Sequence, residues 1–245
     1  GRGELAMLLA RSLLFDALFY SVMGAMGLLL APAAALSRHA ALWSMKRFVA
    51  IAFWLLRHLC GLHVEIRGPV PQDPALVIAK HQSFLDVLIL TYALPQPRFV
   101  MKAELKWMPV LGFYAWRIGC TPVVRASGAK ALRGLVRDVE KSDLDGQVVI
   151  YPQGTRVAPG AKMRYRPGAA VLYDRHGMVA VPVATNAGLF WGRRSLHRRP
   201  GIAVVEFLEP IAPGLPVPEF MRKIEGRIEA ASDALAQEAQ SVGPA

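Results

Sequence analysis

One uncharged segment limits what this chain can fold into. Residues 17–37 form a run of 21 residues that contains no charged side chain. A helix needs about 20 such residues to cross a bilayer. Pro32 lies inside the run, but proline is more frequent in membrane helices than in soluble ones. The apolar part of a secretory signal peptide would be shorter, so the run predicts a helix that lies in or on a membrane.

A second apolar stretch follows at residues 40–62 and carries three Lys or Arg side chains. Its apolar residues recur at helical spacing, and the indole rings of Trp43 and Trp54 suit the lipid headgroup level. We therefore expect a helical hairpin, with helices over residues 5–36 and 40–60, that attaches the chain to a membrane. The alternative is that both helices cover the core of a soluble fold.

From residue 62 the apolar pattern changes, and short β-rich runs alternate with helical ones. The expected strands are residues 62–67, 75–79, 98–101, 121–124, 147–151, 178–185 and 202–208. The expected helices are residues 84–93, 108–116, 128–142, 165–176 and 219–240. This alternation favours an α/β fold class with a mixed, partly parallel sheet flanked by helices. We therefore divide the chain into a membrane-associated helical hairpin at residues 1–61 and an α/β domain at residues 62–245.

The chain is both hydrophobic, at 53%, and basic, with a formal net charge of +11. Residues 151–200 hold nine Lys or Arg against one acidic residue, Asp174. This combination favours an anionic membrane surface or an anionic substrate, although a solvated basic face is the alternative. Nucleic acid would explain the charge but not the hydrophobicity, and no motif that reads nucleic acid is present, so we expect no nucleic-acid partner.

The two cysteines, Cys60 and Cys120, both lie in apolar surroundings, and the sequence has no Cys-x-x-Cys pair or Cys/His cluster. A disulfide framework and a zinc site are therefore not expected. The simplest interpretation is two buried free thiols in a reducing compartment, and we predict no metal site.

The first chemically informative stretch is residues 77–86, where a buried strand turns polar at its end. Sites in α/β sheets gather at the carboxyl ends of strands. His81 would leave the strand there, Ser83 would cap the next helix, and Asp86 would fall in its first turns. A carboxylate against Nδ1–H leaves Nε2 free to take a proton, which is the arrangement of a general base and its orienting group. On its own this pair is more typical of a structural histidine at a strand end.

Two further strands end in residues that suit a phosphate. Residues 148–156 run from an apolar strand into a tight turn, where Gly154 permits close backbone approach and Thr155 offers a hydroxyl. Arg156 then supplies a planar fork that matches phosphate oxygens. The strand before residue 125 ends in a second guanidinium, that of Arg125. Three strand ends therefore supply a base, an orienting carboxylate and two phosphate-binding groups.

Together these stretches resemble the glycerolipid acyltransferase superfamily, in particular the bacterial 1-acyl-glycerol-3-phosphate acyltransferases. That family has four blocks in a fixed order, and roughly residues 62–210 match their order and spacing. The blocks are His81-x4-Asp86, a Gly-rich strand ending in Arg at residues 119–125, an aromatic-Pro-Glu-Gly-Thr-Arg motif at residues 151–156, and a Val-Pro-Val strand at residues 181–183.

The resemblance implies transfer of a fatty acyl group from acyl carrier protein or coenzyme A to the sn-2 hydroxyl of 1-acyl-glycerol-3-phosphate, which gives phosphatidic acid. It implies His81 and Asp86 as the catalytic pair, no metal, and no cofactor besides the thioester co-substrate. It also implies a bacterial inner membrane location with the site on the cytoplasmic side. The substrate-binding residues implied are Lys102, Arg125, Gln153, Gly154, Thr155 and Arg156.

Two departures from the family pattern leave the acceptor open. Gln153 stands where the family usually has Glu, and Val124 stands where it often has Asp. Glutamine keeps the hydrogen-bonding capacity but not the charge. One alternative is therefore O-acylation of a lyso-aminolipid such as lyso-ornithine lipid. Another is a peripheral membrane-binding protein without enzymatic activity.

Two groups of residues outside the four blocks have further candidate roles. Five apolar side chains are expected either to line an acyl-chain groove or to pack in the core: Phe84, Leu85, Trp107, Phe113 and Trp116. Seven basic side chains are expected to contact anionic lipid or an acidic carrier protein: Lys162, Arg164, Arg166, Arg193, Arg194, Arg198 and Arg199.

Overall fold

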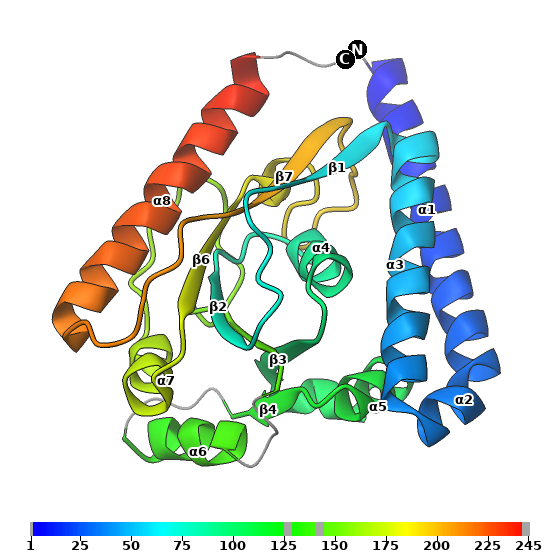
Figure 1. Ribbon diagram of the computed structural model, residues 1–245. Coiled ribbons are helices and arrows are strands. Elements are labelled where there is room, and N and C mark those ends of the chain that lie inside the picture. The colour runs from blue at the N-terminus through cyan, green and yellow to red at the C-terminus, as the bar shows by residue number, and fades with distance from the viewer. Residues whose placement is uncertain (1, 125–128, 141–144, 242–245) are drawn as a thin grey trace.

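A seven-stranded sheet forms the centre of the chain, whose computed structural model describes residues 2–124, 129–140 and 145–241 (Figure 1). The strand order is β1-β7-β6-β2-β5-β3-β4. The strands are β1 Leu62–Arg67, β2 Ala75–Ala79, β3 Pro97–Lys102, β4 Thr121–Val123, β5 Gln147–Ile150, β6 Ala180–Thr185 and β7 Gly201–Phe207. All seven strands expected from the sequence are present.

The sheet is mixed, as expected. Strands β6, β2, β5, β3 and β4 run parallel, β7 is antiparallel to β6, and β1 is parallel to β7. In the centre, Ile78 of β2 lies beside Ile150 of β5 and Pro182 of β6. Every residue of β2, β5 and β6 is buried, which is typical of parallel strands covered on both faces. The α/β class with a partly parallel sheet is therefore confirmed.

Helices cover both faces of this sheet (Figure 1). The α-helices are α1 Arg2–Leu29, α2 Ala31–Leu36, α3 Arg38–Cys60, α4 Leu85–Ala93, α5 Pro109–Arg117, α6 Ala129–Glu140, α7 Gly168–His176 and α8 Val217–Ser241. Two short 3-10 helices are η1 Ala103–Trp107 and η2 Ala187–Leu189. The helices expected between the strands are all confirmed, with shifts of a few residues at their ends.

Alternation along the strands divides the core into two layers. Val77 and Ala79 of β2 pack in the cluster that contains residues of α1, α3 and α4. Leu76 and Ile78 pack in the cluster that contains residues of α6, α7 and α8. Successive side chains of a strand point to opposite faces of the sheet. The same alternation continues for the two residues after β2, so Lys80 lies on the face covered by α8 and His81 lies on the other face.

The N-terminal helices form the expected hairpin, with one difference. The single helix expected over residues 5–36 is divided into α1 and α2, and Pro32 lies in the first turn of α2, where its missing N–H is tolerated. Ser37 caps α3 through its hydroxyl, which accepts from the Ala40 N–H at 3.3 Å. The stretch Gly3–Leu29 is the one described helix long and apolar enough to cross a membrane, and only 17% of its most apolar window is buried in the protein.

Candidate active site

His81 and Asp86 lie in contact where β2 gives way to α4. The His81 Nδ1 atom is 2.9 Å from the Asp86 Oδ1 atom. The Asp86 side chain is 1% exposed, whereas the His81 side chain keeps 12% of its surface accessible. The predicted contact between these two side chains is therefore present, and the imidazole reaches the protein surface.

Backbone groups at the start of α4 hold the Asp86 carboxylate in place. Its Oδ2 atom accepts from the N–H groups of Gln82 at 2.8 Å and Ser83 at 2.7 Å. The N-terminus of a helix favours a negative charge, so the position suits a carboxylate. As expected, Ser83 caps the start of α4: its hydroxyl accepts from the Leu85 N–H at 3.0 Å, whereas Phe84 makes no side-chain cap. The same hydroxyl donates to the Trp191 carbonyl at 2.6 Å.

The Tyr151 ring stacks on the imidazole of His81. The two ring centroids are 4.0 Å apart and the planes are inclined by 23°. Burial, and after it the negative charge of Asp86, raise the pKa of the Tyr151 hydroxyl well above its ordinary value. The hydroxyl therefore stays neutral at physiological pH. Sequence reasoning counted Tyr151 only as the aromatic position of its motif and missed this stacking role.

The loop after β5 is hydrogen bonded to the backbone of His81 on both sides. The Val157 N–H donates to the His81 carbonyl at 2.8 Å, and the His81 N–H donates to the Gln153 Oε1 atom at 3.4 Å. The neighbouring strands β2 and β5 are parallel, so their carboxyl ends meet at one edge of the sheet. This topology brings together the two blocks that lie about 70 residues apart in sequence.

Gly154 and Gln153 occupy special positions in this loop. Gly154 has a φ of +69°, a conformation that L side chains rarely adopt, and its N–H closes a tight turn onto the Tyr151 carbonyl at 2.9 Å. Gln153 is 1% exposed, and its Nε2 atom is buried without a hydrogen-bond partner in the described part of the chain. Gln153 thus lies beneath the His81 backbone rather than on the open surface.

Two of the predicted phosphate-binding residues, Thr155 and Arg156, belong to the same loop. Thr155 and Arg156 are partly exposed at its end. A Cβ atom placed on Gly154 would lie 3.3 Å from the Arg166 Cζ atom, so the Arg166 guanidinium packs over the turn. Lys102 ends β3 and is paired with Glu104 at 3.1 Å. Arg125 lies outside the described residues.

A buried ion pair stands behind His81, on the opposite face of the sheet. The Lys80 side chain is 2% exposed, and its Nζ atom lies 2.6 Å from the Glu229 Oε1 atom of α8. The Tyr165 hydroxyl donates to the same carboxylate oxygen at 2.8 Å. The sequence analysis did not single out Lys80 or Glu229, because nothing local indicates that α8 packs against the end of β2.

One basic residue has a different role from the one expected. Arg198 is 5% exposed and is not on the lipid-accessible surface. Its Nη2 atom lies 2.6 Å from the Asp16 Oδ1 atom of α1, and its Cζ atom lies 4.2 Å from the centroid of the Trp191 ring. The expectation that Arg198 contacts lipid or a carrier protein is wrong, because the guanidinium fastens α1 to the loop before β7.

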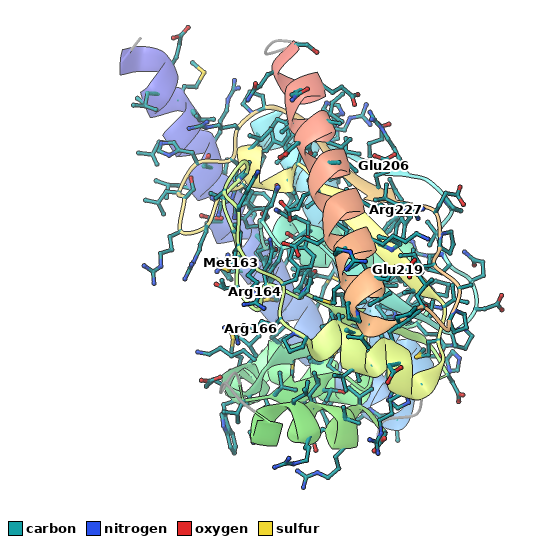
Figure 2. All side chains as sticks on the ribbon, turned by 90° about the vertical axis from the view of Figure 1, so that its left-hand side faces the viewer. Met163, Arg164, Arg166, Glu206, Glu219 and Arg227 are labelled. Atoms are coloured by element: carbon teal, nitrogen blue, oxygen red, sulfur yellow. The ribbon has the colours of Figure 1, made fainter. Side chains whose placement is uncertain are left out.

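The other basic residues of that group are accessible. Figure 2 shows Arg164 and Arg166, together with Met163, to one side of α8. The exposed members of the group are Lys162, Arg164, Arg166, Arg193, Arg194 and Arg199.

The five candidate groove residues divide into core and surface. Leu85 is fully buried in the core, and Phe84 and Phe113 are partly buried against other aromatic rings. Trp107 and Trp116 are 79% and 68% exposed, so they are surface residues and do not line a groove in this structure. Among the described residues, no group of three or more His, Cys, Asp or Glu side chains is arranged to hold a metal ion.

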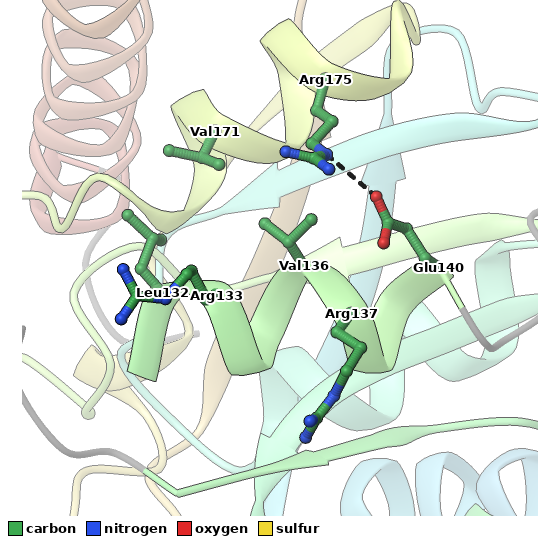
Figure 3. Close-up of a pocket in the computed structure, with 7 residues that line it drawn as sticks. All are labelled: Leu132, Arg133, Val136, Arg137, Glu140, Val171 and Arg175. Carbon is green, nitrogen blue, oxygen red and sulfur yellow. Dashed lines mark hydrogen bonds and ion pairs between the residues drawn. The ribbon is translucent and has the colours of Figure 1, made fainter. Parts of the chain in front are cut away.

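Neither of the two best-defined pockets in the described part of the chain contains His81 or Asp86 in its lining. Figure 3 shows a pocket of about 370 Å³ between α6 and α7, where Arg175 pairs with Glu140 at 3.0 Å, and the catalytic candidates do not line it. The second pocket, of about 290 Å³, is lined by Gly188, His197 and Arg199 among others. The Gly188 N–H donates to the Gln82 Oε1 atom at 3.1 Å, so this second pocket adjoins the His81 loop.

The sequence places this fold, with its histidine–carboxylate pair, in a known family. The profile of the family described as Acyltransferase matches residues 61–186, just over half of the chain, and the chain belongs to that family. It is 28% identical over 160 residues to the 1-acyl-sn-glycerol-3-phosphate acyltransferase of Pseudomonas aeruginosa, which covers 64% of this chain and 62% of that protein. It is also 28% identical over 163 residues to the human 1-acyl-sn-glycerol-3-phosphate acyltransferase alpha, covering 64% and 57%.

A solved structure has the same overall fold. The 1-acyl-sn-glycerophosphate (LPA) acyltransferase PlsC from Thermotoga maritima superposes with a TM-score of 0.76 at 21% identity, covering 92% of this chain and 96% of that one. The curated sequence relatives are matched over about three fifths of their own length. The likeness to the solved structure supports the fold, including the N-terminal helices that the family profile does not reach.

Proposed function

We propose that the chain is a 1-acyl-glycerol-3-phosphate O-acyltransferase, which moves a fatty acyl group from acyl carrier protein or coenzyme A to the sn-2 hydroxyl and forms phosphatidic acid. The observation that carries this proposal is the partly exposed His81 imidazole, held through Nδ1 by the buried Asp86 carboxylate. The names of the sequence relatives support the choice of acceptor.

The chemistry uses the two nitrogens of His81 differently. The Nδ1–H donates to Asp86, so Nε2 accepts the proton of the acceptor hydroxyl as its oxygen attacks the thioester carbonyl. The tetrahedral intermediate then expels the thiolate, which takes up the proton from the imidazolium. Asp86 keeps the tautomer and stabilises the positive charge on the ring. The acceptor hydroxyl is itself the nucleophile, so no covalent acyl-enzyme forms, and the proposal includes no metal and no cofactor besides the thioester.

The loop after β5 supplies the groups for the acceptor phosphate and the developing oxyanion. Arg156 offers a fork for phosphate oxygens, with Lys102 and Arg125 as further cations. The left-handed turn at Gly154, followed by Thr155, lets backbone N–H groups approach the reacting carbonyl. Gln153 acts in this scheme by supporting the His81 backbone from below.

Membrane attachment belongs to the same proposal, because the acceptor is a lipid. The apolar and largely unburied helix α1 supports attachment to a bilayer, which we take to be the bacterial inner membrane with the site facing the cytoplasm. The exposed basic residues between β5 and β7 provide charge for an anionic lipid surface or an acidic carrier protein. No nucleic-acid partner is part of the proposal.

A matrix of thioester donors against lysolipid acceptors tests the proposal, with purified protein in mixed micelles. Wild type should form phosphatidic acid, and His81→Ala should lose activity by about 10²–10⁴-fold, the usual contribution of a general base. His63→Ala, which removes an exposed imidazole on β1, is the matched control. Absence of acceptor-dependent thiol release from the wild type would instead favour a membrane-binding protein without enzymatic activity.

A second acceptor is favoured by one specific observation. The buried position beneath His81 is occupied by the neutral Gln153, whose Nε2 atom has no hydrogen-bond partner among the residues that the structure describes. The family usually has Glu at this position, so this site carries one negative charge fewer than the family's site and suits a different headgroup. The alternative function is therefore O-acylation of a lyso-aminolipid such as lyso-ornithine lipid. Wild type and Gln153→Glu, assayed under the same conditions with 1-acyl-glycerol-3-phosphate and with the lyso-aminolipid, separate the two acceptors. A large excess of phosphatidic acid over any aminolipid product excludes the lyso-aminolipid.

A further inference from the structure

Two exposed tryptophans stand outside the N-terminal hairpin and have no role in the proposed chemistry. Trp107, at the end of η1, is 79% exposed, and Trp116, near the end of α5, is 68% exposed. Met108 lies between them and is 46% exposed. Single exposed apolar residues are common on soluble proteins, but large apolar side chains gathered on one short segment usually mark a contact surface.

A basic side chain lies close to each of these two indole rings. The Lys106 Nζ atom lies 4.9 Å from the centroid of the Trp107 ring, and the Arg117 Cζ atom lies 5.5 Å from that of Trp116. An indole ring has an apolar body and a polar N–H, so it prefers the boundary between acyl chains and headgroups. A cation beside it at that depth meets the anionic phosphates. The chemistry of the segment therefore fits a lipid surface.

The segment is fixed to the membrane hairpin. The Arg117 Nε atom donates to the Ala34 carbonyl of α2 at 2.8 Å, and the Tyr114 hydroxyl donates to the Gly27 carbonyl of α1 at 3.3 Å. Gly27 is also covered by Val110, because a Cβ atom there would lie 2.5 Å from the Val110 Cγ1 atom. Helix α5 is thus docked closely onto the turn between α1 and α3.

The hairpin exposes its own apolar residues at that turn. Leu28, Leu29 and Leu36 are 73%, 78% and 89% exposed. Figure 1 shows α5 beside α2 and the adjoining ends of α1 and α3, so the leucines of the turn and the tryptophan segment belong to one end of the molecule. A bilayer that receives the turn of the hairpin therefore also meets η1 and α5.

We propose that η1 and α5 form a second membrane contact, with Trp107 and Trp116 in the headgroup layer and the hairpin turn beside them. Because η1 follows β3 directly after Lys102, this contact holds the carboxyl edge of the sheet close to the lipid surface. The proposal concerns attachment and is independent of whether the chain transfers acyl groups.

Fluorescence quenching by brominated phospholipids tests this contact. The chain has five tryptophans, and vesicles of phosphatidylethanolamine and phosphatidylglycerol with brominated acyl chains quench those that lie in the bilayer. Trp107→Phe and Trp116→Phe should each remove part of the quenchable emission. Trp191→Phe is the matched control, because Trp191 is 7% exposed in the core and its removal should leave the quenchable part unchanged. If neither Trp107→Phe nor Trp116→Phe changes the fraction of emission that the brominated lipids quench, the proposal is wrong and membrane contact is confined to the hairpin.

Vesicle binding and activity give a second, separate measurement. The double variant Trp107→Ala/Trp116→Ala should bind the same vesicles at least about tenfold more weakly than Ile202→Ala, since two large apolar side chains leave the bilayer. Ile202 is 44% exposed on β7, at the far end of α3. Acyl transfer in detergent micelles should persist in the double tryptophan variant and in Ile202→Ala. A loss of acyl transfer in micelles therefore bears on the catalytic proposal and not on the membrane contact. If the double variant instead turns a dimer into a monomer and binds vesicles normally, the patch is an interface between two copies.

Discussion

Lys80 and Glu229 are 149 residues apart in the chain, yet their side chains form a buried ion pair directly behind His81. Lys80 directly follows β2, and Glu229 belongs to α8. The pair ties the C-terminal helix to the strand that presents the imidazole. Because Glu229 lies beyond the residues that the family profile matches, this chain supports its site from outside the region that defines its family.

Removing the Glu229 carboxylate should destabilise the chain by about 3–5 kcal/mol, because the Lys80 ammonium is left buried and unpaired. Glu229→Gln should cost more than Lys80→Met, since Lys80 is 2% exposed and Glu229 is 22% exposed. Urea unfolding in detergent measures the difference. The double variant Lys80→Met/Glu229→Met should recover much of the loss. Single variants that unfold within about 0.5 kcal/mol of wild type would contradict a stabilising pair.

Replacing Asp86 with Asn should lower kcat by about 10²–10⁴-fold, because the amide cannot hold the His81 tautomer and stabilise the imidazolium as the carboxylate does. KM for the lysolipid should change little, since Asp86 is 1% exposed and does not reach the substrate. Steady-state kinetics on wild type and Asp86→Asn measures both constants. A loss confined to KM would assign Asp86 to binding instead.

Stability should fall as the pH rises above about 9, the ordinary pKa of a thiol. Burial raises the pKa of Cys120 to about 12, whereas the unfolded chain has no such burial. Between these two values the unfolded state has released the proton and the folded state has kept it, so unfolding becomes easier with rising pH. Each pH unit costs up to about 1.4 kcal/mol from this one group. Unfolding at pH 8 to 11 measures the slope.

Cys120→Ala is the control for that slope. It removes the thiol and should make the pH dependence less steep, with Cys60, whose pKa burial raises to about 11, still contributing. The variant is also less stable at every pH because it loses packing. An identical slope in wild type and Cys120→Ala would show that other groups cause the alkaline loss. Cys120 should also react with a maleimide more slowly in the folded chain than in urea, since the residue is partly buried and the pKa of its thiol is raised.

Arg198→Leu should loosen α1 from the body of the protein. The change leaves Asp16 without its guanidinium partner and removes the stacking on Trp191. We expect a loss of about 1–3 kcal/mol, below the value for a fully buried pair, because Asp16 is 20% exposed. Limited proteolysis within α1 and thermal unfolding both measure it. The neighbouring Arg199→Leu is the control, since Arg199 is exposed, and equal effects of the two changes would contradict this assignment.

The sequence alone determined the elements of the fold and the chemistry of the strand ends. Alternating strands and helices predicted all seven strands, because period-2 and period-3.6 apolar patterns are local properties. The His81 and Asp86 contact was also predictable, since five residues across a strand-to-helix bend keep two side chains within reach. The catalytic and binding roles of the site residues stay predictions, and Arg125 lies outside the described residues.

Only the tertiary structure decided which distant residues meet. Arg198 is buried and paired with Asp16, so it does not lie at the lipid surface. Trp107 and Trp116 lie on the surface and not in a groove. The tertiary structure also set Glu229 against Lys80. These outcomes depend on how helices dock on a sheet, and docking depends on side chains far apart in the chain whose proximity no local pattern encodes.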